Sequence, residues 1–176
     1  MWNLKSSPPL APLVALVSRL ESGGVPCALG GSGLLAALGL AHEVRDWDLT
    51  TDASLDHVRE IVRDLPYAHS GHIDVHVDDK LIFDGEQLEL IVRFALRSSD
   101  GVVRIPTIVV ARRENVPLGS PEAWAVAYAL MDRAAKAKLL FDHLKDHGAD
   151  RSVVERLLHQ PLPDGVRTSL LDLPAA

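Results

Sequence analysis

A glycine-rich turn followed by two closely spaced carboxylates limits most strongly what this chain can fold into. Gly30-Gly31-Ser32-Gly33 comes first, and Asp46-Trp47-Asp48 follows after a short apolar stretch. Side chains in a strand alternate between faces, so Asp46 and Asp48 would point the same way. Two like charges side by side repel each other unless a cation lies between them. The pattern therefore predicts a divalent-metal site beside a phosphate-binding turn.

Length and composition indicate one domain with a sizeable core. The chain has 176 residues, 47% of them hydrophobic, and its longest apolar run, 123–131, is too short to cross a bilayer. Residues 1–20 lack the pattern of a signal peptide. The chain has a single cysteine, Cys27, which excludes an internal disulfide and is typical of a reducing compartment. We expect Cys27 to lie in the core. We therefore expect a cytoplasmic protein with no membrane segment.

The charge balance argues against long nucleic acid as a partner. The net charge is −6 and only 5% of the residues are aromatic, whereas bulk nucleic-acid binding needs clustered cations and single strands need stacking rings. A nucleotide held through Mg²⁺ remains compatible with this charge, and an acidic cleft favours a cationic acceptor.

Hydrophobic periodicity divides the chain into a mixed front and a helical back. In the front we expect helices ending at Ser22, over 34–38 and over 55–62, and strands over 25–29, 46–50, 73–77 and 88–96, with a further strand, 102–110, broken by Pro106. Hairpin turns are expected at Asp78-Asp79 and Asp84-Gly85. The back is expected to hold helices over 121–131, 134–147 and 150–159.

The predicted class is α+β, because the strands cluster as hairpins rather than alternating with helices. We expect a mixed β-sheet flanked by helices, with a helical C-terminal part. The expected divisions are an α/β core over residues 1–118, a helical part over 119–160 and a loosely held tail over 161–176.

One set of residues resembles the head motif of the DNA polymerase β-type nucleotidyltransferase superfamily. It comprises Gly30-Gly31-Ser32, Gly39 and the stretch 46–52. The stretch Asp48-Leu49-Thr50-Thr51-Asp52-Ala53 is similar to the corresponding part of CCA-adding enzymes, and the glycine pattern is similar to that of lincosamide and aminoglycoside nucleotidyltransferases. Small prokaryotic nucleotidyltransferase-like proteins also share Asp84-Gly85 with Glu89, Ile105-Pro106, and a helix spaced as Tyr128, Arg133 and Lys136. The resemblance covers about residues 10–147.

This resemblance implies a nucleotidyltransferase-like fold and a defined set of site residues. Asp46, Asp48 and Glu89 would be the catalytic carboxylates that hold Mg²⁺ or Mn²⁺, with Glu89 activating the attacking hydroxyl. The triphosphate would be held by the glycine-rich turn and by two cations from the later helix; these nucleotide-binding residues are Gly30, Gly31, Ser32, Arg133 and Lys136.

The implied reaction moves a nucleoside monophosphate from a nucleoside triphosphate to a hydroxyl of a small molecule, a protein or RNA, and releases pyrophosphate. Leu34-Leu35 stands where CCA-adding enzymes carry an Arg-Asp pair, which argues against a tRNA substrate. The alternative is a non-catalytic nucleotide-binding protein, or one half of a toxin–antitoxin pair that binds a protein partner.

Several residues keep a second interpretation. Asp74 and Asp84 are alternatives to Glu89 as the third carboxylate. His72, Asp74 and His76 share one face of a predicted strand and could form a separate transition-metal site of a hydrolase. Trp124 and Tyr128, four residues apart, are expected to pack in the core rather than stack on a base.

Overall fold

The computed structural model describes residues 2, 4–83, 85 and 87–176. Its helices are α1 (Leu10–Ser22), α2 (Gly31–Ala37), α3 (Leu55–Ile61), α4 (Pro121–Leu130), α5 (Ala134–His147), α6 (Arg151–Leu158) and α7 (Asp164–Leu171). Its strands are β1 (Ala28–Leu29), β2 (Trp47–Thr51), β3 (Ala68–Ser70), β4 (Asp79–Phe83), β5 (Leu88–Val92), β6 (Ala95–Ser98), β7 (Gly101–Arg104), β8 (Val109–Arg113) and β9 (Val116–Gly119). The class is α+β, as predicted.

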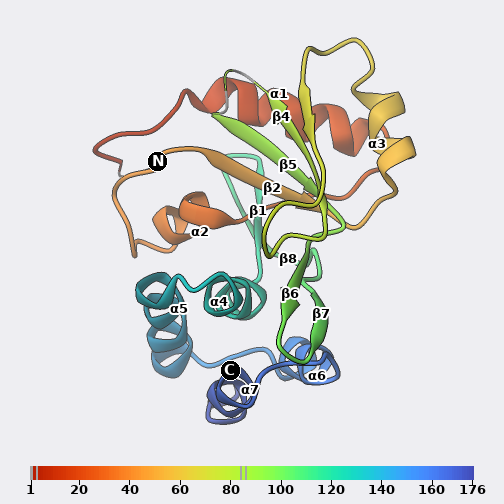
Figure 1. Cartoon of the computed structure of the whole chain (residues 1–176). Helices are drawn as coiled ribbons and strands as arrows, with labels where there is room; N and C mark the ends of the chain where they lie inside the picture. Colours follow the sequence, from red (N-terminus) through yellow and green to blue (C-terminus); the bar gives the residue numbers. More distant parts are fainter. Residues whose placement is uncertain (1, 3, 84, 86) are drawn as a thin grey trace.

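Seven strands form one mixed sheet in the order β3-β4-β5-β2-β1-β9-β8, and β6 pairs with β7 in a separate hairpin. Strands β2 and β5 run parallel at the centre of the sheet, while β4 is antiparallel to β5. In Figure 1 the sheet and helices α1–α3 form the upper half, and α4–α7 form the lower half. The β6–β7 hairpin reaches down from the sheet toward α6.

One face of the central strands is fully buried, and the other carries a carboxylate near the start of each strand. Trp47, Leu49 and Thr51 of β2 are buried, whereas Asp48 between them is only half-buried. Asp48 lies opposite Glu89 in the parallel register of β2 and β5. Because residues at matching register share a face, both carboxylates emerge on the side of the sheet that faces the helical half.

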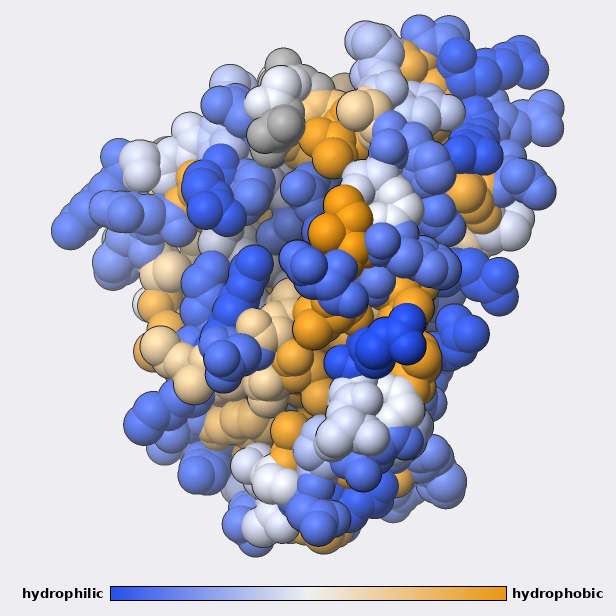
Figure 2. Space-filling view, in the orientation of Figure 1, coloured by the Kyte–Doolittle hydropathy of each residue, from blue (hydrophilic) through white to orange (hydrophobic). Residues whose placement is uncertain are grey.

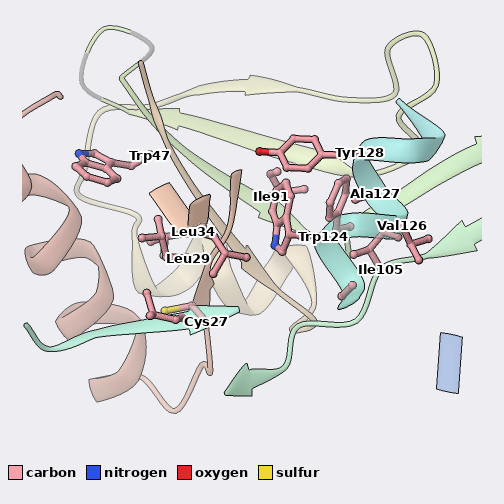
Figure 3. Packing of buried hydrophobic residues seen from close by; sticks show 14 of the residues in the cluster. Cys27, Leu29, Leu34, Trp47, Ile91, Ile105, Trp124, Val126, Ala127 and Tyr128 are labelled. Carbon is pink, nitrogen blue, oxygen red and sulfur yellow. The ribbon is translucent and has the colours of Figure 1, made fainter. Parts of the chain in front are cut away.

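Helix α4 joins the two halves through its buried aromatic side chains. Ser120 caps this helix by accepting a hydrogen bond from the Ala123 N–H (3.1 Å). Figure 3 shows Trp124 and Tyr128 of α4 directed toward the sheet, in the neighbourhood of Ile91. Both rings are almost fully buried, which agrees with the expected core packing. Figure 2 shows hydrophobic residues along the middle of this face, between hydrophilic residues of the two halves.

Most predicted elements are present, and two differ for identifiable reasons. The strand expected over 88–96 ends at Val92, because Arg93 adopts a left-handed backbone (φ 56°) that turns the chain into β6. The strand expected over 73–77 is absent: Ile73 is 56% exposed, and only His76 forms a bridge, to Leu96. Pairing with β6 is limited to two hydrogen bonds, from the Val77 N–H to the Ala95 carbonyl oxygen (2.9 Å) and from the Arg97 N–H to the Val75 carbonyl oxygen (2.7 Å). The left-handed backbone of Asp74 (φ 53°) interrupts the extended chain that a longer strand needs.

The turns and the C-terminal tail also differ from expectation in part. Asp79 begins β4 rather than forming a hairpin turn, and the turn expected at Asp84-Gly85 includes residue 84, which lies outside the described residues. The segment 161–176 contains helix α7, and Leu170 and Leu173 are buried. Prolines in this segment start a helix instead of loosening the chain, since α7 follows directly after Pro163. In the described part of the chain, each helix falls short of the length and apolar character needed to span a membrane.

Candidate functional site

The glycine-rich turn packs directly against the first helix of the lower half and against Asp48. Gly31 has φ 55°, and a Cβ at this residue would overlap the Asp48 carboxylate. A Cβ at Gly30 would overlap the indole ring of Trp124. The absence of a side chain at Gly31 lets the loop approach the carboxylate, and its absence at Gly30 makes room for the indole ring. Helix α2 begins within this turn, and the Ser32 hydroxyl donates a hydrogen bond to the Asp46 carbonyl oxygen (3.4 Å).

The structure brings three predicted carboxylates to one cavity. Asp46 precedes β2, Asp48 lies within β2 and Glu89 lies on β5, and all three line a cavity of about 100 Å³. Cations already approach two of them: Lys80 Nζ lies 3.2 Å from Glu89 Oε2, and Arg45 Nε lies 3.6 Å from Asp46 Oδ2. The lining thus sets three carboxylates against three cations, Arg45, Lys80 and Arg133, at close range.

Asp48 has the most perturbed ionisation in this cavity. Burial, followed by repulsion from Asp46 and Glu89, raises the pKa of Asp48 from 3.8 to about 7. Lys80 and Arg133 oppose this shift. A carboxyl group with a pKa near neutral pH becomes fully charged when a cation binds beside it.

A wider cavity of about 680 Å³ shares Asp46 and Asp48 with the first one. Ser32 lines it on the side of the glycine-rich turn, and Arg133 and Lys136 line it on the side of α5. Partial burial, and next the Arg133 guanidinium, lower the pKa of Lys136. Arg133 lines the carboxylate cavity as well. The two cations and the two aspartates thus line one continuous space, which suits a ligand that carries phosphates and a bound metal.

Aromatic rings connect the carboxylate cavity to the helical half. Neighbouring rings lie 5.3–6.0 Å apart between centroids, in the order His76, Phe94, Trp124 and Tyr128. Lys136 Nζ lies 5.3 Å from the Tyr128 ring centroid. Among the described residues the buried Tyr128 hydroxyl has no hydrogen-bond partner, and burial followed by the negative charge of Asp48 raises its pKa.

The residues at the cavity fit a hard divalent cation. Mg²⁺ prefers oxygen ligands and is commonly held by one or two carboxylates together with substrate phosphates. Asp46 and Asp48 supply such carboxylates, and the mutual repulsion that raises the pKa of Asp48 is what a cation would relieve. In the described ranges, no three His, Cys, Asp or Glu side chains are already grouped as a metal site. Phosphate oxygens of a bound nucleotide would therefore complete the set of oxygen ligands around such a cation.

Of the alternative site residues that the structure describes, His76 lines the carboxylate cavity, whereas His72 and Asp74 do not. His76 bonds to Asp78 (3.1 Å) rather than converging with His72 and Asp74, both of which are exposed. Asp84, the other alternative to Glu89, is outside the described residues. Lys80 and Arg45 were not anticipated from the sequence. Lys80 contacts Glu89 because of the register in which β4 pairs with β5, and no local sequence pattern indicates that register.

Comparison with solved structures places this architecture among known folds. A proposed nucleotidyltransferase from Thermotoga maritima is 22% identical with a TM-score of 0.53, covering 78% of this chain and 92% of that one. The antibiotic-resistance factor ANT(2″)-Ia in solution is 17% identical with a TM-score of 0.50, covering 78% and 86%. The crystal structure of ANT(2″)-Ia with adenylyl-2″-tobramycin is 14% identical with a TM-score of 0.57, covering 92% and 96%.

No protein-family model and no curated protein sequence matches the chain. At 14–22% identity, the structural likenesses show the fold. The chain has the nucleotidyltransferase-like fold, in which a mixed sheet carries helices on its faces and a helical part follows it.

Proposed function

We propose that this protein transfers a nucleoside monophosphate from a nucleoside triphosphate to an acceptor hydroxyl, with release of pyrophosphate. The observation that carries the proposal is the junction of two cavities, one lined by Asp46, Asp48 and Glu89 and the other by Ser32, Arg133 and Lys136. Carboxylates for a metal therefore adjoin cations for a triphosphate. The shared fold with ANT(2″)-Ia, which was solved with adenylyl-2″-tobramycin, supports the same reaction class.

Each polar group has a role that follows from its place. Lys136, Arg133 and the Ser32 hydroxyl hold the triphosphate at the wider cavity, since guanidinium and ammonium groups are strong phosphate donors. Asp46 and Asp48 hold Mg²⁺, or Mn²⁺, which supplies positive charge at the reacting phosphate. Glu89 faces the same cavity and serves as the base for the acceptor hydroxyl.

The bond changes are those of an in-line displacement. The acceptor oxygen forms a bond to the α-phosphorus as its proton passes to the Glu89 carboxylate, and the bond from the α-phosphorus to the bridging oxygen breaks. Pyrophosphate leaves toward Arg133 and Lys136. Lys80, 3.2 Å from Glu89, keeps this carboxylate oriented into the cavity.

Transfer of label from each of four α-³²P nucleoside triphosphates into a cell extract, with Mg²⁺ or Mn²⁺, tests the proposal. We expect label to appear with the native protein and to fall at least 100-fold with Asp48→Asn or Glu89→Gln. Asp74→Asn is the matched control, because Asp74 is exposed and was the alternative third carboxylate. Circular dichroism and melting curves establish that each variant is folded.

The outcomes separate the competing functions. Loss of transfer with Asp74→Asn but not with Glu89→Gln would reassign the base. Nucleotide binding without transfer to any fraction would contradict the proposal and favour the non-catalytic, partner-binding alternative. The fraction that takes up label identifies the acceptor class.

A further inference from the structure

Three arginine side chains that the proposed reaction does not use line a separate cavity of about 210 Å³. Arg93 follows β5, Arg104 ends β7, and Arg156 lies on α6, so the β6–β7 region and the distant helix α6 meet here. The other lining residues are Asp52, Phe94, Ile105, Pro106 and Gln160.

The arginine cavity is distinct from the carboxylate cavity. Among the described residues, Phe94 alone lines both, and its side chain is only 1% exposed. A buried aromatic ring thus forms a wall between them. A ligand in the arginine cavity would lie on the far side of this wall from Asp48 and Glu89.

The charges around this cavity favour an anion. Asp52 accepts hydrogen bonds from the Thr107 N–H (3.2 Å to each oxygen) and lies 4.0 Å from Arg156 Nη2. In the part of the chain that the structure describes, the side chains of Arg93 and Arg104 make no ion pair. One carboxylate faces three guanidinium groups, so the lining carries an excess of positive charge in a chain whose net charge is −6.

The backbone at Arg93 is a second, independent observation. Its φ of 56° lies in the left-handed region, which is unfavourable for a residue with a Cβ and which glycine adopts freely. The Arg93 N–H donates to the Thr51 carbonyl oxygen (2.7 Å), which fixes this bend. The bend leaves Arg93 exposed while Phe94 is buried. An arginine at a position that suits glycine indicates that its side chain has a use.

We propose that this cavity binds the phosphate group of a small phosphorylated molecule. Guanidinium groups bind phosphate oxygens in pairs, and three arginines from different elements surround a phosphate better than a single helix end does. The overall negative charge of the chain disfavours a long polyanion at the same place. In Figure 2 strongly hydrophilic residues lie over the upper end of the β6–β7 hairpin, on the face shown.

Nuclear magnetic resonance of the ¹⁵N-labelled protein tests this site residue by residue. Inorganic phosphate, ribose 5-phosphate and a short RNA would each be titrated at constant ionic strength. We expect the two small ligands to shift the amide signals of 93–94, 104–105 and 156–160. Signals of 46–48 and 132–136 report separately on the proposed nucleotide site, so the failure of one site is distinguishable from the failure of the other.

The variant Arg93→Gly is the sharpest test, because glycine relieves the left-handed backbone while it removes the guanidinium. We expect it to melt no lower than the native protein and to bind phosphate about tenfold more weakly, as for the loss of one charge-assisted contact. Arg97→Ala is the matched control, since Arg97 is exposed on β6 and lines none of these cavities.

Three results would overturn the proposal. They are unchanged phosphate affinity in Arg93→Gly, shifts confined to 46–48 and 132–136, and tighter binding of the RNA than of either small ligand.

Discussion

The backbone of Gly31 lies so close to the Asp48 carboxylate that a side chain on residue 31 would occupy the position of Oδ2. A turn from the start of α2 and a carboxylate from β2 are therefore fitted to each other, although 17 positions separate them in the chain. The fit makes Gly31 a sensitive probe of the proposed site.

Replacement of Gly31 by alanine is expected to abolish detectable nucleotide transfer. The new Cβ would displace the Asp48 carboxylate, and the residue would have to adopt an unfavourable φ of 55°. Gly39→Ala is the matched control, because Gly39 has φ 75° but nothing within 4 Å of the place that a Cβ would take. The control should lose only about 1–2 kcal/mol of folding free energy and retain transfer. Urea unfolding and label transfer measure the two effects; retained transfer in Gly31→Ala would show that the site tolerates a side chain there.

The stability of the metal-free protein should fall as the pH rises from about 4 to about 7. The pKa of Asp48 is raised from 3.8 to about 7, so over this range the folded state binds a proton that the unfolded state has released. The loss is as much as about 4 kcal/mol at pH 8 and becomes negligible below about pH 3. Urea unfolding in EDTA measures the free energy at each pH.

The Asp48→Asn variant provides the control for that profile, because an amide does not titrate. We expect its stability to exceed that of the native protein at pH 8 and to match it near pH 4. Added Mg²⁺ should stabilise the native protein at pH 8 much more than the variant. Parallel pH profiles for the two proteins would show that Asp48 does not carry the effect.

Replacement of Lys136 by alanine should weaken nucleoside triphosphate binding by about tenfold, through loss of one charge-assisted phosphate contact. Lys136 lines the wider cavity, whereas Lys138 on the same helix is exposed and pairs with Asp142 (2.5 Å). Lys138→Ala therefore removes an equal charge without touching the cavity. Calorimetric titration with a nucleoside triphosphate and Mg²⁺ compares the two variants; equal affinities would assign Lys136 to the surface.

Glu122 is expected to be the most costly acidic residue to remove from the helical half. It is 4% exposed, and it accepts hydrogen bonds from the Ser120 hydroxyl (2.6 Å) and the Asp150 N–H (2.9 Å). Glu122→Ala leaves these donors unpaired and should cost about 2–3 kcal/mol in urea unfolding. Glu155→Ala, an exposed change on α6, should cost less than about 0.5 kcal/mol. Equal costs for the two variants would refute the structural role of Glu122.

Local patterns were enough to predict much of the fold. The helix over 134–147 was predicted with the bounds that the structure gives, since Gly148 ends its periodic apolar face. Ser54, just before the helix expected over 55–62, caps α3 by accepting a hydrogen bond from the His57 N–H (3.3 Å). These features depend on residues within a few positions of each other, which is the range over which sequence patterns are informative.

The pairing and register of the strands could not be predicted in this way. The hairpin of β8 and β9 turns at Glu114 and Asn115, both with positive φ, and the prediction contained no such turn. The contact of Lys80 with Glu89 depends on the register of β4 against β5. Register depends on which faces the whole sheet buries, so it is decided only when the strands are assembled.

The same limit applies to the candidate site. The resemblance was sufficient to select Asp46, Asp48, Glu89 and the two cations Arg133 and Lys136, and their roles stay predictions. Arg93 was expected to continue a strand, and its left-handed backbone depends on the hydrogen bond to Thr51 in another strand. When a distant partner fixes the backbone conformation of a residue, the neighbouring sequence does not indicate that conformation.

The contact between Gly30 and Trp124 has a consequence for how chains of this fold diversify. Gly30 belongs to the turn before α2 and Trp124 to α4, and the indole ring fills the space that a side chain at residue 30 would need. The two positions are steric complements. Recombination that joins this sheet half to the helices of a relative would succeed only where the pair is inherited together, so residues 30 and 124 should covary in size among homologous sequences.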